Sequence, residues 1–97
     1  MEIVITEQAL KWFKEDIGYK SGDKVRFFVK IYGSSPVQEG YSLAFAKDDP
    51  LDIAVSVESE GILFFVEETD LWFFDGHDLH VNYDEQEDEL EYNYIKP

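Results

Sequence analysis

The sequence predicts a β-rich α+β fold, and three observations lead to this prediction. Apolar and polar residues alternate over several short segments, which is the two-residue period of a half-buried strand. One segment near the N-terminus instead has the three-and-four spacing of an amphipathic helix. The chain is 44% hydrophobic and 16% aromatic, enough to build one core. Because its 97 residues leave no room for a second core, we expect a single domain over residues 1–97.

The N-terminal segment predicts a strand followed by the helix. Residues 2–5 are rich in apolar side chains, and Thr6 then stands where a hydroxyl can cap the first turn of a helix. A helix of about 11 residues would end at Gly18, a typical C-terminal cap. Its expected buried stripe consists of Ala9, Leu10, Phe13 and Ile17.

Two aromatic-rich strands, residues 24–32 and 41–46, flank a long loop. In the first strand the expected inward residues are Val25, Phe27, Val29 and Ile31. The loop at residues 33–40 is longer than the two to five residues usual between hairpin strands. Long loops between well-formed strands are often functional, so this loop is the first place to expect a site.

The second half of the chain predicts further hairpins. Residues 52–58 alternate with Ile53 on the inner face, and Glu60 and Gly61 form a tight turn into residues 62–66. The nearly continuous apolar run at residues 62–66 predicts a central strand that is buried on both faces.

The C-terminal part predicts one short helical segment before the last hairpin. Thr69 or Asp70 is expected to cap a short helical turn that closes at Gly76. Residues 79–83 and 90–94 then read as two strands. The turn between them holds five carboxylates within residues 84–89, a pattern typical of a solvated hairpin end, with a docking patch for a basic partner as the alternative.

Composition excludes several classes of function. The formal net charge of −14, from 22 acidic and 8 basic side chains, disfavours nucleic acid as a partner. No apolar stretch approaches the roughly 18 residues of a membrane span, and the first residues do not resemble a secretory leader, so we expect a cytoplasmic protein. Cysteine is absent, which removes thiolate ligands and thiol nucleophiles. No G-x-S-x-G or P-loop motif is present, and we therefore expect neither an enzyme nor a bound cofactor.

The two histidines provide the only pattern that resembles a metal site. They lie in the stretch DGHDLH, where carboxylate and imidazole groups of a kind that suits Zn²⁺ or Fe²⁺ fall close together. Their spacing matches no specific metal signature, so the alternative is a turn decorated with polar residues. The weak candidate ligands are Asp75, His77, Asp78 and His80.

Two stretches resemble a known family. DLWFFDGHDLHVNY, residues 70–83, and VQEGYSL, residues 37–43, are similar to segments of the HesB-like domain of A-type iron-sulfur carriers, more closely its small YneR-type branch. The resemblance covers essentially the whole chain. It implies two small mixed sheets in a compact sandwich with one N-terminal helix and a short helix before the last hairpin, together with a tendency to form dimers or higher oligomers.

The resemblance also implies three cysteine ligands, and this chain has none. One would lie in the loop at residues 33–40 and two in a Cys-x-Cys tail, whereas the loop offers serines and the chain ends in YNYIKP. Serine oxygen is a poor cluster ligand. The sequence therefore predicts a HesB-like protein without cluster chemistry that acts as a non-enzymatic interaction module, with a protein partner and self-association as the expected contacts.

The expected recognition surface is the long loop with its two flanking tyrosines. The alternative function is an iron-binding or iron-sulfur assembly accessory protein that uses the carboxylate and imidazole groups of the DGHDLH stretch. The residues assigned to the recognition surface are Tyr32, Gly33, Ser34, Ser35, Gln38, Glu39 and Tyr41.

Overall fold

The computed structural model describes residues 1–31, 33, 35–38 and 40–97. Tyr32, Ser34 and Glu39, three of the seven residues assigned to the recognition surface, lie outside the described residues. The strands are β1 (Ile3–Ile5), β2 (Lys24–Lys30), β3 (Ser42–Lys47), β4 (Ile53–Ser59), β5 (Ile62–Glu67), β6 (Asp78–Asp84) and β7 (Glu89–Ile95). The helical segments are α1 (Glu7–Trp12), η1 (Phe13–Ile17) and η2 (Glu68–Phe74).

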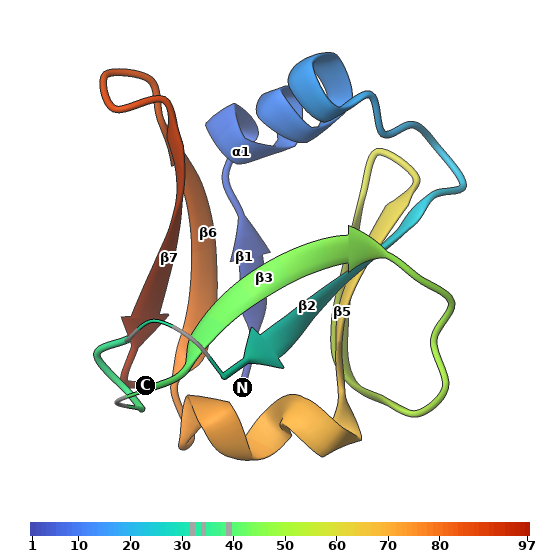
Figure 1. Cartoon of the computed structure of the whole chain (residues 1–97). Coiled ribbons are helices and arrows are strands. Elements are labelled where there is room, and N and C mark those ends of the chain that lie inside the picture. The colour runs from blue at the N-terminus through green and yellow to red at the C-terminus, as the bar shows by residue number, and fades with distance from the viewer. Residues whose placement is uncertain (32, 34, 39) are drawn as a thin grey trace.

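The strands form two mixed sheets, as the predicted architecture requires (Figure 1). The smaller sheet has the order β1-β6-β7, with β1 parallel to β6, and the larger has the order β3-β2-β5-β4, with β2 parallel to β5. In Figure 1, α1 and η1 lie at the top of the molecule and η2 at the bottom. The expected β-rich α+β sandwich, with one N-terminal helix and a short helix before the last hairpin, is confirmed.

The core lies between the two sheets and is rich in phenylalanine. Strand β5 lies in the interior of its sheet, and Ile62, Phe64, Phe65 and Val66 are buried, because its side chains are covered on both faces. The predicted central strand is therefore confirmed. The fully buried rings are Phe13, Phe27, Phe64, Phe65, Phe73 and Phe74.

The N-terminal helix begins as predicted and ends differently. The Thr6 hydroxyl accepts a hydrogen bond from the Ala9 N–H at 3.1 Å, which caps α1. From Phe13 the helix widens into the π-helical segment η1, and Gly18, at φ 89°, ends it. Widening changes the angular position of later residues, so Ile17 is 40% exposed and the prediction that it belongs to the buried stripe is wrong.

Three other local predictions are wrong. Ile31 is 75% exposed because it lies beyond the end of β2, and Ile53, the first residue of β4, is also exposed. Neither Thr69 nor Asp70 caps η2, which begins after Glu67 without a side-chain cap and closes at Asp75 in the left-handed conformation. Asp70 is instead a buried ion-pair partner, described below.

None of the helices in the described part of the chain is long and apolar enough to cross a membrane.

Candidate functional site

The loop that follows β2 contains a tight turn. The Ser35 hydroxyl accepts a hydrogen bond from the Gln38 N–H and donates one to the Gln38 carbonyl, each at 3.1 Å. The Gln38 carbonyl also accepts a hydrogen bond from the Tyr41 N–H at 3.4 Å. Local hydrogen bonds therefore connect Ser35, Gln38 and Tyr41, three of the residues assigned to the recognition surface.

Tyr41 connects this loop to η2. Its ring meets the ring of Trp72 edge to face, with the centroids 5.2 Å apart. Trp72 is 50% exposed, and its neighbour Leu71 is also exposed, whereas Phe73 and Phe74 of the same helix are fully buried. The LWFF stretch thus divides into an outward half and an inward half.

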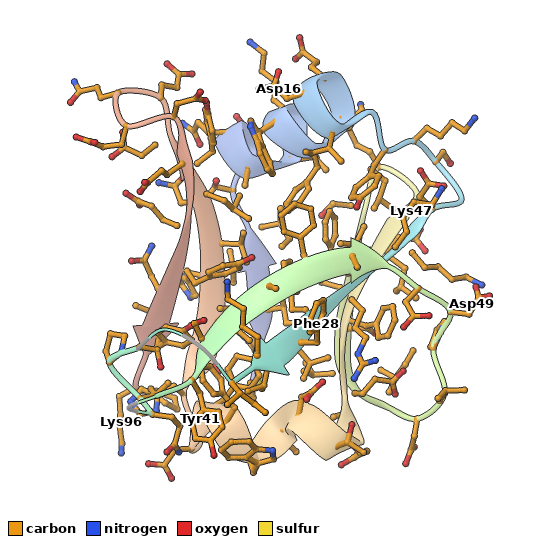
Figure 2. The ribbon with its side chains drawn as sticks, in the orientation of Figure 1. Asp16, Phe28, Tyr41, Lys47, Asp49 and Lys96 are labelled. Atoms are coloured by element: carbon orange, nitrogen blue, oxygen red, sulfur yellow. The ribbon has the colours of Figure 1, made fainter. Side chains whose placement is uncertain are left out.

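Exposed apolar residues gather around this contact. Ile31 directly follows Lys30, which pairs with Ser42 beside Tyr41. In Figure 1 the end of β2, the end of β7 and η2 all lie at the bottom, and Figure 2 places Tyr41 at that end. We call this surface the aromatic end, and its apolar members are Ile31, Tyr41, Leu71 and Trp72.

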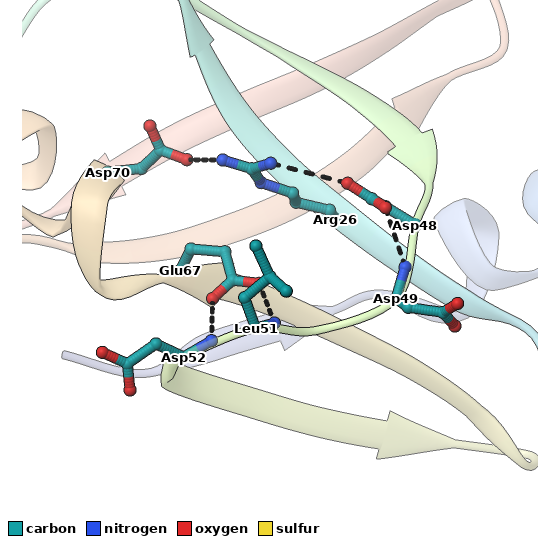
Figure 3. Close-up of polar contacts among 7 residues, drawn as sticks. All are labelled: Arg26, Asp48, Asp49, Leu51, Asp52, Glu67 and Asp70. Carbon is teal, nitrogen blue, oxygen red and sulfur yellow. Dashed lines mark hydrogen bonds and ion pairs between the residues drawn. The ribbon is translucent and has the colours of Figure 1, made fainter.

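A buried ion pair holds η2 in place (Figure 3). The Arg26 guanidinium on β2 donates a hydrogen bond to the Asp70 carboxylate at 2.9 Å and lies 3.5 Å from the Asp48 carboxylate. The hydrogen bond that Arg26 donates to Asp70 is the main cause that raises the pKa of Arg26. Because Asp70 is buried, this pair fixes η2, and therefore Trp72, against the larger sheet.

A second buried carboxylate holds the loop before β4. Glu67 accepts hydrogen bonds from the backbone N–H groups of Leu51 at 2.7 Å and Asp52 at 2.6 Å. The side chain of Leu51 is left 93% exposed. The sequence assigned no role to Glu67 and predicted Asp70 only as a helix cap, since a charge within a strand or helical turn carries no sign of its distant partner.

The candidate metal ligands do not converge. His77 directs its Nδ1 to the carbonyls of Phe74, at 2.8 Å, and Asp75, at 3.2 Å, so that it closes the end of η2. Asp78 accepts a hydrogen bond from the Glu2 N–H at 2.7 Å, while His80 lies within β6. No group of three potential ligands occurs among the described residues. The iron-binding alternative is therefore not supported.

Of the residues assigned from sequence, the structure places Gly33, Ser35, Gln38 and Tyr41 along the described part of the loop. Trp72 and Leu71, on a different segment, were not assigned. The signal for them was the LWFF stretch, in which four consecutive large residues cannot all point the same way.

Comparison with known proteins corrects the family expected from sequence. No family model matches the chain. A Bacillus subtilis (strain 168) protein named "Pyruvate dehydrogenase inhibitor" is 52% identical over 94 residues, which cover 97% of this chain and 99% of the relative. Its name describes an inhibitor of a metabolic enzyme, so the assignments to iron-sulfur carriers and to cluster biogenesis are wrong.

Staphylococcal relatives are similar over the same length. A Staphylococcus saprophyticus protein is 36% identical, covering 95% of this chain and 97% of its own. A Staphylococcus haemolyticus protein is 30% identical, covering 99% and 100%. Both are named as uncharacterised proteins. The chain belongs to the family of the Bacillus subtilis pyruvate dehydrogenase inhibitor.

Proposed function

We propose that this chain binds pyruvate dehydrogenase and inhibits it by occupying part of its surface, without catalysing a reaction. The observation that supports this function most strongly is the 52% identity to the Bacillus subtilis inhibitor over nearly the full length of both chains. The proposed partner is a protein, and the proposed location is the cytoplasm, together with that enzyme.

The aromatic end is the surface that we assign to this contact. Aromatic residues are enriched at the centre of protein interfaces, where a few of them account for most of the binding free energy. Trp72 is half exposed, yet its ring already contacts Tyr41 and Phe73. A ring that is already held in place loses little conformational freedom on binding, so Trp72 suits an anchor residue.

The supporting parts of this surface come from both sides of Trp72. Gly33, Ser35 and Gln38 provide a polar rim from the loop, while Leu71 provides apolar area from η2. The ion pair between Arg26 and Asp70 holds η2 against β2, the strand that leads into the loop. The proposed interface is thus an aromatic centre with a polar border.

The proposal is tested by titrating purified pyruvate dehydrogenase with this chain and measuring NADH formation. We expect inhibition that saturates with the concentration of the chain and is constant over the incubation time, because occupancy reaches equilibrium whereas covalent modification accumulates. Lactate dehydrogenase, which also uses pyruvate and a nicotinamide cofactor, is the control for depletion of substrate. An unchanged rate of pyruvate dehydrogenase at saturating concentrations of the chain would refute the function.

The choice of surface is tested separately with matched variants. Trp72→Ala removes the proposed anchor, while Leu51→Ala removes an apolar side chain that is 93% exposed in a different loop. We expect Trp72→Ala to weaken inhibition by about 30-fold, the effect of losing a hot-spot residue, and Leu51→Ala to leave it unchanged. If both variants inhibit as strongly as the unmodified chain, the contact lies outside the aromatic end. That result would not refute the function itself.

A further inference from the structure

We propose that a second site, at the opposite end of the molecule, binds an arginine side chain of a protein partner. The site is a cleft of about 180 Å³ between the N-terminal helix and the β6–β7 hairpin. Pockets for whole small molecules usually measure about 300 Å³ or more, so this cleft suits a single side chain. We call it the acidic cleft, and its lining residues are Gln8, Lys11, Trp12, Glu15, Asp16, Tyr83 and Glu85.

Two stacked rings form the apolar part of the acidic cleft. The rings of Trp12 and Tyr83 lie 5.6 Å apart at an interplanar angle of 18°. Trp12 also makes edge contacts with Phe13 and Phe45, so the core holds its position. Aromatic rings attract cations, and Trp does so most strongly.

Tyr83 brings a further carboxylate close to the acidic cleft. Its hydroxyl donates a hydrogen bond to the Asp88 carboxylate at the hairpin tip. This hydrogen bond is the main cause that raises the pKa of Tyr83 to about 12. The Asp88 carboxylate, held at the hydroxyl of Tyr83, adds negative potential beside the acidic cleft.

Three carboxylates supply the charge of the acidic cleft. Among the described residues, the side chains of Glu15, Asp16 and Glu85 have no hydrogen bond or ion pair, unlike the buried Asp70. Lys11 is the single cation in the lining. The lining thus carries two more negative than positive charges, which favours a cationic ligand and repels an anionic one.

Arginine fits this combination better than lysine or a metal ion. The guanidinium group is planar, stacks on aromatic rings and loses its hydration more easily than an ammonium group. It also presents several N–H donors that can reach more than one carboxylate. The described residues contain no group of three metal ligands, which argues against a metal ion here.

The acidic cleft and the aromatic end are separate surfaces. Asp16 lies at the top of Figure 2, whereas Tyr41 lies at the bottom, and the molecule extends 34 Å along its longest axis. A short peptide bound in the acidic cleft would leave the aromatic end free. This proposal therefore does not depend on the proposed function.

The two tryptophans allow a direct test by NMR, because Trp12 lines the acidic cleft and Trp72 belongs to the aromatic end. The probe is the peptide acetyl-Gly-Arg-Gly-amide, titrated to about 20 mM into the ¹⁵N-labelled chain, a range that detects a Kd of about 1 mM. We expect the indole N–H signal of Trp12 to shift in a saturable way and that of Trp72 to stay unchanged. The Trp72→Phe variant assigns the two signals.

The matched control peptide contains citrulline, the neutral isostere of arginine. We expect no saturable shift with citrulline, since both the carboxylates and the rings act on the charge. Equal shifts with the two peptides, equal shifts of both tryptophans, or no shift at all would overturn the proposal.

Variants of the hairpin tip test the carboxylates. Glu85→Gln removes a charge that lines the acidic cleft, whereas Glu87→Gln removes the same charge from the same turn outside the lining. We expect Glu85→Gln to weaken peptide binding about threefold and Glu87→Gln to change it much less, because a charge outside the cleft is largely screened by salt. Equal effects of the two changes would show general attraction to an acidic protein and would overturn the site.

Discussion

The two tryptophans of this chain use the same side chain for different purposes. Trp12 is half-buried and contacts three rings, Phe13, Phe45 and Tyr83, at the edge of the core. Trp72 contacts two rings and keeps 50% of its surface exposed. A packed ring contributes to stability, whereas an exposed ring that is held in place is available to a partner. Both rings are held by their neighbours, so exposure rather than such support distinguishes them: Trp12 mainly stabilises the core and also lines the acidic cleft, whereas Trp72 is open to a partner over half of its surface.

The largest expected effect on stability comes from removing the side chain of Trp12, the more tightly packed of the two tryptophans. Trp12→Ala removes contacts with three rings, and we expect it to lower the free energy of unfolding by about 3 kcal/mol. Trp72→Ala, at a half-exposed position, should lower it by less than about 1 kcal/mol. Denaturant unfolding followed by circular dichroism measures both. Equal losses would show that Trp72 also serves the core.

The next effect concerns the ion pair beneath Trp72. Asp70→Asn leaves the Arg26 guanidinium without its main partner, and because the pair is mostly buried we expect a loss of about 2 kcal/mol in the free energy of unfolding. Lys14→Gln, which breaks the exposed pair with Glu60, is the control and should change stability by less than about 0.5 kcal/mol. If Asp70→Asn is as mild as the control, η2 does not depend on this pair.

The free energy of unfolding is expected to fall at alkaline pH, because two partly buried tyrosines lie on β7, the strand that packs against η2 near the aromatic end. Burial raises the pKa of Tyr94, which packs beneath η2, to about 12, and burial also raises the pKa of Tyr92. A free tyrosine titrates near pH 10, so the folded state favours the neutral form. The stability that the fold gains from keeping Tyr94 neutral is therefore fully present below about pH 10. It is lost as the pH rises towards 12.

This prediction is checked by unfolding measurements between pH 8 and about 12, together with the ultraviolet absorbance of phenolate. Tyr94→Phe removes one of the titrating groups, so we expect its stability to fall less steeply over this range. An identical pH profile for this variant would assign the alkaline loss to other groups.

The smallest expected effect is spectroscopic. In the single-tryptophan variants Trp12→Phe and Trp72→Phe, we expect acrylamide to quench the fluorescence of Trp72 more strongly than that of Trp12. The reason is that Trp72 is more exposed than the half-buried Trp12. Equal quenching would remove the difference on which the comparison rests.

Sequence patterns predicted most of the fold because the alternation of side chains follows burial directly. The central strand β5 was evident from its continuous apolar run. The failures lie where the regular period ends: Ile31 and Ile53 at strand ends, and Ile17 where the helix widens. Local patterns carry no information about these positions.

The candidate site was only partly predictable. The length of the loop at residues 33–40 drew attention to it, but Tyr41 meets Trp72 through a contact between residues 31 positions apart. Likewise, Arg26 and Asp70 are 44 residues apart in the chain. Such pairs depend on how the sheets and η2 pack, which periodicity does not encode.

The central claim, that this chain contacts pyruvate dehydrogenase through the aromatic end, is tested most directly by equilibrium binding. Calorimetric titration of the purified enzyme should show saturable binding of the unmodified chain and of Leu51→Ala with the same Kd. The account predicts a Kd about 30-fold weaker for Trp72→Ala, provided that this variant stays folded. Unchanged affinity of Trp72→Ala, or the absence of binding by the unmodified chain, would contradict it.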